Sequence, residues 1–168
     1  ANTKVVYPFT EEWATHNDPR MDLSIADYRY GYSNSSGTIK TDGYIKFFDC
    51  IGSASPSEEQ KNKQRQLFTP AKWDTEKYVQ SGNYIINNDK SNVTWYVLRY
   101  SDVLLLYAEA ENEVNGPCPA AFDAVNLVRR RAFGNSDHDV DTSISQEDFR
   151  ELIRRERGYE LCFEGHRK

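Results

Sequence analysis

Clusters of cysteine and histidine are absent from this sequence of 168 residues, which contains only three of each. Cys50, Cys118 and Cys162 lie far apart and are odd in number, so they indicate neither a disulfide framework nor a CxxC metal motif. The histidines are isolated as well, and they lack the HxxxH or His/Cys spacing that a zinc site requires. We therefore predict that the protein uses no metal and no cofactor.

Basic residues are also scarce relative to acidic ones, with 21 Lys and Arg against 26 Asp and Glu and a net charge of −5. Nucleic-acid binding depends on clustered Lys and Arg, so this balance argues against a nucleic-acid partner and favours a neutral or cationic ligand. No stretch approaches the roughly 18 apolar residues of a membrane span. The glycine fingerprints of nucleotide-binding enzymes and the nucleophile elbow of hydrolases are missing too, which favours a binding protein over an enzyme.

The chain consists of two parts of different character, an irregular one over residues 1–94 and a helical one over residues 95–168. In the first part, Tyr28–Tyr32 alternates in the manner of a β-strand, and two shorter β-type runs follow on either side of a turn at 41–43. This pattern predicts a hairpin or small meander. The polar stretch at 52–66 predicts an exposed, mobile loop with room for one helical turn.

The second part has the 3.6-residue period of helices. A first helix begins near residue 95 and ends at Gly116, and we expect it to be buried over much of its circumference. Pro119 begins a second helix that ends at Gly134, and a capping-box pattern at 145–148 begins a third. The first two helices resemble one tetratricopeptide unit, which buries its apolar face only by packing against neighbouring units.

Two acids interrupt the apolar stripe of the third helix. Glu156 and Glu160 fall on the same face as its large apolar residues, and a buried carboxylate without a partner costs several kcal/mol. We therefore expect Arg99 and Arg129 to pair with these two acids as a structural ion pair. The alternative is that one of the acids acts in catalysis.

Three sequence blocks resemble the signature of the SusD/RagB family. They begin at Trp95 (WYVLRYSDVLLLYAEAENE), Ala124 (AVNLVRRRA) and Asp148 (DFRELIRRERGYELCFEGHR), and they come in the order and spacing of that family. Upstream, Asn17-Asp18-Pro19-Arg20 and Lys72-Trp73 also resemble family landmarks. The likeness covers most of the chain.

This resemblance implies a mainly α fold in which tetratricopeptide-like helices support a loop-rich ligand-binding region. It also implies a lipoprotein on the outer membrane of Bacteroidetes, anchored through a lipid at an N-terminus that this chain does not contain. Such a protein binds oligosaccharides without catalysis and delivers them to a TonB-dependent, SusC-like transporter. We expect the chain to be the C-terminal region of such a protein, truncated at both ends.

The matched blocks form scaffold rather than site, so candidate ligand contacts must come from the chemistry of sugars. Sugar rings stack on exposed aromatic side chains and bind polar groups through their hydroxyls. The irregular part offers both kinds, with the aromatic platforms Trp13, Tyr28, Tyr30 and Tyr32 and the polar partners Asp27, Arg29 and Asn34. The alternative is that these tyrosines pack the hairpin against the helices.

Three other interpretations remain open. Residues 137–148 place oxygen atoms as a calcium loop does, but they lack the glycine and the terminal bidentate glutamate, which favours a plain acidic linker. A peptide-binding tetratricopeptide adaptor would explain the helix pair but not the tyrosine-rich part. A glycoside hydrolase would need two carboxylates facing each other across a cleft, and the sequence contains many acids.

Overall fold

The chain divides into two units. The computed structural model describes residues 7–32, 39–46, 55–73, 86–87, 90–91 and 96–166, with side chains described for 10–28, 55–73 and 96–166. Residues 1–16 and 21–74 form unit 1, and residues 17–20 and 75–168 form unit 2. The sequence divided the chain near residue 95. Unit 2 instead begins at residue 75 and also includes the short segment 17–20.

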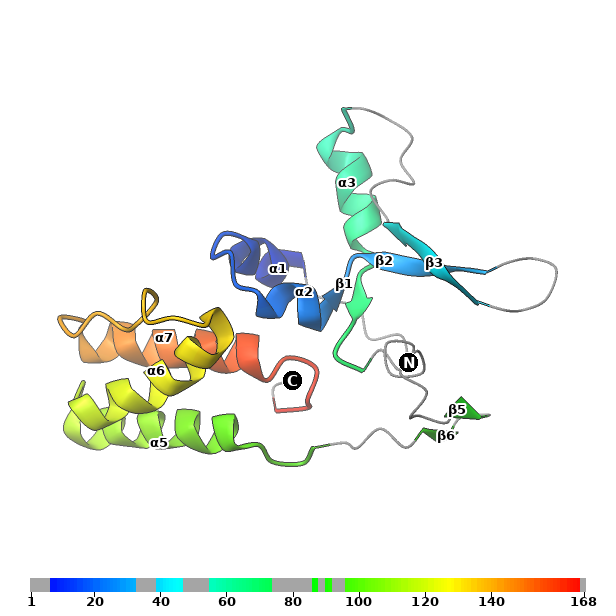
Figure 1. Ribbon diagram of the computed structural model, residues 1–168. Coiled ribbons are helices and arrows are strands. Elements are labelled where there is room, and N and C mark those ends of the chain that lie inside the picture. Colours follow the sequence, from blue (N-terminus) through cyan, green and yellow to red (C-terminus); the bar gives the residue numbers. More distant parts are fainter. Residues whose placement is uncertain are drawn as a thin grey trace. The chain divides into compact units, whose positions relative to one another are not determined.

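Unit 1 contains short helices and two small antiparallel sheets. The elements are α1 (Tyr7–Ala14), α2 (Arg20–Ser24, whose first residue belongs to unit 2), β1 (Ile25–Ala26), β2 (Tyr28–Tyr32), β3 (Ile39–Lys46), α3 (Glu58–Arg65) and β4 (Thr69–Pro70). β1 pairs with β4, and β2 pairs with β3 (Figure 1). The predicted hairpin is therefore present.

The hairpin is simpler than the meander that the sequence also allowed. β3 runs without a break from Ile39 to Lys46, so the turn predicted at 41–43 is wrong. Tyr30 pairs with Tyr44 and Tyr32 with Ile39, and the register shifts between these two pairs. Such an irregularity lets a strand absorb extra residues, which explains how a segment with turn chemistry stays within β3.

The polar stretch after residue 52 contains a helix of two turns instead of a loop with a single turn. Ser57 caps α3 by accepting a hydrogen bond from the backbone of Gln60, whose side chain accepts one from the backbone of Ser57. Glu58 also pairs with Lys61 at 2.7 Å. No residue of α3 is buried, so local capping and side-chain pairs hold it, and the predicted exposure is correct.

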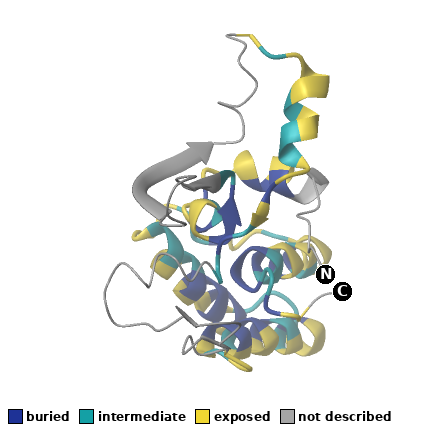
Figure 2. Cartoon of the chain, turned by 90° about the vertical axis from the view of Figure 1, so that its right-hand side faces the viewer, coloured by how far each residue is buried: buried dark blue, intermediate teal, exposed yellow. Residues whose placement is uncertain are grey.

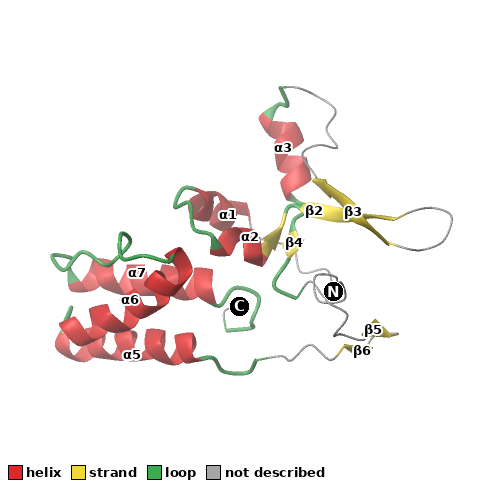
Figure 3. Ribbon diagram, in the orientation of Figure 1, coloured by secondary structure: helices red, strands yellow, loops and turns green. Residues whose placement is uncertain are grey.

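Unit 2 is built on three helices, α5 (Tyr100–Asn115), α6 (Pro119–Phe133) and α7 (Gln146–Glu160), and it also contains the paired strands β5 (Ile86–Asn87) and β6 (Lys90–Ser91). α5 packs against both α6 and α7 (Figures 1 and 3). The predicted boundaries hold at Pro119, at Gly134 and at the Ser145 cap of α7. Gly134 has a φ of 76°, a left-handed conformation that favours glycine.

The core of unit 2 lies between these three helices. Phe149 and Ile153 of α7 are fully buried against Leu105 of α5 and Val125 of α6. The rings of Phe122 and Phe149 are tilted with their centroids 5.0 Å apart, a favourable aromatic arrangement. Figure 2 shows the buried faces of the helices turned toward one another. The described part of the chain is thus mainly helical with a small hairpin, as the sequence predicted.

α5 differs from its prediction in two respects. It begins at Tyr100 instead of near residue 95, and Val97, within the predicted range of the helix, is 83% exposed. Only one face is buried, the one formed by Ser101, Asp102, Leu105, Ala108 and Asn112. The expectation that α5 is buried over much of its circumference is therefore wrong for the described chain.

Candidate functional site

The hairpin of unit 1 carries most of the side chains predicted to contact a ligand. Asp27, just before β2, and Tyr28, its first residue, are both half-buried and so keep part of their surface in contact with solvent. Arg29, Tyr30 and Tyr32 continue the same strand, of which the backbone is described. The pairing of β2 with β3 thus places four of the seven predicted residues on one continuous strand.

One of the predicted ligand contacts does not belong with this group. Trp13 is in α1, and its side chain is fully buried at 0% exposure. A ring with no exposed face cannot stack on a sugar, so the predicted role of Trp13 as a surface platform does not fit its position. The sequence around Trp13 did not indicate its burial, because Trp13 follows Glu11 and Glu12 and no helix was predicted there. Asn34 lies outside the described residues.

Unit 2 brings together the acids and arginines that the sequence paired. Nη1 of Arg99 lies 2.9 Å from Oε1 of Glu160, and Nη1 of Arg129 lies 3.3 Å from Oε2 of Glu156. Both acids are buried: Glu156 is 2% exposed and Glu160 is 3% exposed. The expected ion pairs are present, and each acid has more than one partner.

Arg20, from the segment 17–20, is the residue at the centre of this cluster. Its Nη1 atom lies 2.7 Å from Oε1 of Glu156 and 3.2 Å from Oε2 of Glu160. The first contact is an ion pair without the alignment of a hydrogen bond, whereas Arg20 also donates two aligned bonds from Nε to Asp18, of 3.0 and 3.1 Å. Its guanidinium group also lies 5.9 Å from the ring centroid of Phe133, a cation–π distance.

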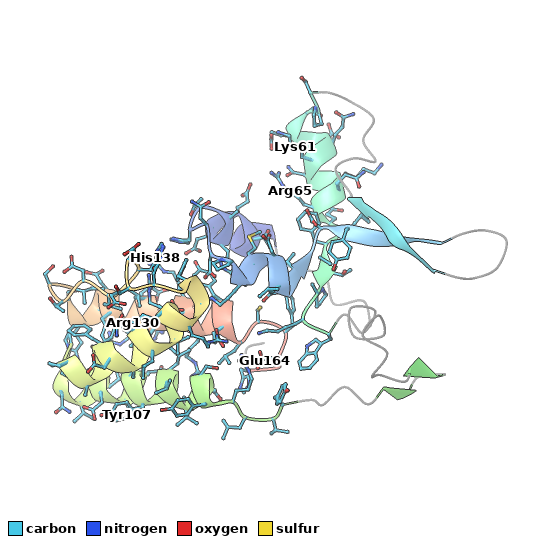
Figure 4. The ribbon with its side chains drawn as sticks, in the orientation of Figure 1. Lys61, Arg65, Tyr107, Arg130, His138 and Glu164 are labelled. Atoms are coloured by element: carbon cyan, nitrogen blue, oxygen red, sulfur yellow. The ribbon has the colours of Figure 1, made fainter. Side chains whose placement is uncertain are left out.

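Two further residues complete the cluster, the exposed Arg131 and the buried Glu164. Nη2 of Arg131 lies 2.6 Å from Glu160, and Arg99 pairs with Glu164 at 2.7 Å. Glu164 follows α7 in the turn near the end of the chain (Figure 4). We call the whole set the arginine–glutamate cluster; it consists of Asp18, Arg20, Arg99, Arg129, Arg131, Glu156, Glu160 and Glu164.

The charges of this cluster balance, with four arginines and four acids. Burial opposes the ionisation of Glu160, but the charges of Arg131 and Arg99 outweigh it and hold the pKa of this carboxyl below its ordinary value. Burial likewise opposes the charge of Arg20, and its hydrogen bond to Asp18 and the charge of Glu156 leave its pKa raised. Both groups therefore stay ionised at neutral pH. This suits a structural cluster, whereas a general acid must carry a proton that it can donate.

The sequence identified four members of the cluster, Glu156, Glu160, Arg99 and Arg129. It missed Asp18, Arg20, Arg131 and Glu164. A periodic pattern marks an acid on an apolar stripe, but it does not reveal a partner that is distant in the sequence. The one sign of these partners in the sequence was the segment 17–20, which resembles a family landmark but had no function assigned to it. Asn17 there has a φ of 49°, a left-handed conformation that asparagine tolerates and that helps to turn the chain into the cluster.

A pocket of about 330 Å³ lies in unit 2 beside the start of α5. It is lined by Tyr100, Leu104, Leu127 and Val128, with Ser101, Arg99 and Arg131 completing its wall. Both arginines already pair with Glu160, so they offer little uncompensated charge to a ligand. The pocket therefore suits an apolar group better than an anion.

Neither a metal nor a membrane is indicated by the part of the chain that the structure describes. That part contains no group of three or more His, Cys, Asp or Glu residues placed to hold a metal ion. Its helices are too short or too polar for any of them to cross a bilayer. In the linker that resembles a calcium loop, Asp141 accepts hydrogen bonds from the backbone and hydroxyl of Ser143.

The geometry of unit 2 and the order of its sequence blocks agree with a comparison against protein families. Residues 3–168 match the model of the SusD family. The chain belongs to the SusD family. Among curated proteins, a SusD-like protein of Formosa agariphila is 46% identical over 72 residues, and a second SusD-like protein of that organism is 37% identical over 93 residues. These alignments cover 43% and 52% of this chain but only 14% and 18% of the two relatives.

Solved structures of SusD relatives share the fold. The crystal structure of a SusD homolog from Bacteroides thetaiotaomicron matches 98% of this chain with a TM-score of 0.75 and 43% identity. A SusD-like protein from Bacteroides fragilis matches 88% of it with a TM-score of 0.53 and 25% identity. The matched regions make up 31% and 26% of those two chains, so this chain spans about a third of a SusD relative or less.

Proposed function

We propose that the protein of which this chain is a part binds oligosaccharides at the cell surface and does not cleave them. The observation that carries this proposal is the match to the SusD family over residues 3–168, which leaves almost no part of the chain outside a family of nutrient-binding proteins. The proposal extends to the rest of the SusD arrangement: a lipid anchor in the outer membrane and a TonB-dependent transporter that receives the oligosaccharide.

The tyrosine-rich hairpin supports the choice of a sugar as the ligand. β2 brings Tyr28, Tyr30 and Tyr32 into one strand, next to Asp27 and Arg29. Aromatic rings bind the apolar faces of sugars, and the charged side chains beside them can bind the hydroxyl groups. We therefore assign the ligand contacts of this chain to the hairpin, with Asn34 beyond the end of β2 as a further polar partner. Trp13 is left out because it is buried.

A hydrolase is a poorer fit to the acids that the structure describes best. Glycoside hydrolysis requires one carboxyl group with a raised pKa that donates a proton and a second one about 5–10 Å away across a cleft. Glu160 instead has a lowered pKa, held there against burial by Arg131 and Arg99. Glu156 is 2% exposed and lies against Arg20 and Arg129. Neither acid is available to a substrate.

Binding and cleavage can be separated in one experiment on the full-length protein. The protein is applied to a glycan array, and each glycan that it retains is then incubated with it and assayed for new reducing ends. We expect retention of at least one oligosaccharide class with no new reducing ends. Release of reducing ends at a rate proportional to protein concentration would contradict a pure binding function, and retention of no glycan would contradict the proposal as a whole.

A further inference from the structure

Asp102, in the first turn of α5, is a buried acid outside the arginine–glutamate cluster, with an exposed fraction of 3%. Its Oδ1 atom lies 2.8 Å from Nη1 of Arg157 in α7. Both atoms are buried, and among the described residues neither finds an aligned hydrogen-bond partner. The ion pair therefore offsets the charge of Asp102 but leaves a buried polar contact incomplete, which costs stability.

The second carboxylate oxygen of Asp102 faces His166, which follows α7. Nδ1 of His166 lies 3.7 Å from Oδ2 of Asp102, and the imidazole side chain is 23% exposed. In the described ranges of the chain, Arg157 and His166 are the two basic side chains that approach this carboxylate. They approach different oxygen atoms, so Asp102 can pair with both of them at once. A protonated imidazole adds an attraction to this site, whereas a neutral one adds no charge.

The backbone after α7 turns so that His166 comes back to α5. Phe163 has a φ of 63° and Gly165 a φ of 84°, both in the left-handed region. A bulky residue such as phenylalanine rarely adopts this conformation and keeps it only where surrounding contacts hold it. One such contact is the ion pair between Glu164 and Arg99, at 2.7 Å, directly before α5 (Figure 4). We call residues 161–166 the α7 turn.

The charged groups around this contact come from three elements. Asp102 belongs to α5 and Arg157 to α7, and Glu164 of the α7 turn pairs with Arg99. Carboxyl and guanidinium groups ordinarily keep their charges near neutral pH. Histidine is the side chain whose charge ordinarily changes between about pH 5 and 8. His166 is therefore the member of this set through which pH can act on the turn.

We propose that His166 makes the hold of the α7 turn on α5 dependent on pH. The protonated imidazole forms an ion pair with Asp102 and closes the end of the turn against the start of α5, and loss of the proton loosens this contact. The ion pair of Glu164 with Arg99 keeps the middle of the turn attached in both states, so the change is local. This inference concerns unit 2 and stands whether or not the protein binds a glycan.

The test measures amide hydrogen exchange of residues 161–166 in the full-length protein at about pH 5.5 and about pH 7.5. Each rate is divided by the rate of the unfolded peptide at the same pH, which removes the chemical effect of pH. We expect protection in the native protein to be about two- to fivefold greater at the lower pH, the range of a partly exposed ion pair. His166→Gln, which is never charged, should show low protection at both values. His166→Lys, which is always charged, should show high protection at both.

Two internal controls separate this effect from others. His16 and His138 are present in all three proteins, so a dependence that comes from them survives in His166→Gln. Residues 119–133 of α6 report the folding of unit 2 and should be equally protected at both pH values. Equal or lower protection of the α7 turn at the lower pH in the native protein would overturn the proposal, even if neither variant folds. So would an unchanged pH dependence in His166→Gln, or an equal change in α6.

Discussion

Arg20 and Glu160 are 140 residues apart in the sequence, yet Nη1 of Arg20 lies 3.2 Å from Oε2 of Glu160. This contact joins the segment 17–20 to the end of α7, and the same arginine also reaches Glu156 and Asp18. A buried charge keeps its place only when its partners are fixed. The arginine–glutamate cluster therefore ties the N-terminal landmark of the chain to the last helix of unit 2.

Glu160→Gln should destabilise the full-length protein by about 3–5 kcal/mol, because it removes one charge from a buried, balanced cluster and leaves its arginines uncompensated. The measurement is the free energy of unfolding from urea denaturation. Glu151→Gln is the matched control, since Glu151 pairs with Arg154 at 3.4 Å on the surface, with half of its side chain exposed. Equal effects of the two substitutions would show that burial of the cluster does not matter for stability.

Arg20→Met and Arg131→Met compare two arginines that contact the same carboxylate. The Arg20 side chain is 9% exposed, whereas that of Arg131 is 59% exposed and can be replaced by water. We expect Arg20→Met to cost about 3 kcal/mol or more and to increase hydrogen exchange in residues 17–20. Arg131→Met should have little effect on either. If Arg131→Met lowered the unfolding free energy more than Arg20→Met, Arg20 would not be the central residue of the cluster.

The stability of the protein should depend on the ionisation of Glu160. The folded state lowers its pKa below the ordinary value of 4.5, so the stabilisation is complete above that value and is lost as the pH falls through the folded pKa. The difference in unfolding free energy between the native protein and Glu160→Gln should be constant near neutrality and shrink below about pH 4.5. A difference that grows toward acid pH would mean that the folded state raises this pKa.

The residues that the sequence placed correctly are those whose partners a local pattern can reveal. The helix ends at Pro119 and Gly134 follow from backbone chemistry, and the pairs of Arg99 and Arg129 follow from two acids on an apolar stripe. Arg20 could not be found in this way, because its partners are brought close only by the folded chain. The sequence also marked apolar positions on α5 without telling which face is turned inward.

The structure of the irregular part, residues 1–94, was harder to predict for a physical reason. α3 has no apolar period, and its local signs are the capping residues Ser57 and Gln60 and the pair of Glu58 with Lys61. The burial of Trp13 depends on residues packed around α1, which a sequence pattern does not contain. The hairpin was predicted because alternation with a period of two is a strong local signal. The sequence did not predict that β3 continues through the turn-like segment at 41–43, where the register shifts.

The hairpin tyrosines provide the most direct test of the ligand site. Tyr30→Ala in the full-length protein should weaken retention on a gel of the bound glycan by about tenfold or more, with an unchanged melting temperature, if the ring stacks on the sugar. Tyr96→Ala is the control, because Tyr96 is 55% exposed and lies outside the hairpin. A lower melting temperature together with weaker retention would favour the alternative role of packing the hairpin. Unchanged retention would remove Tyr30 from the site.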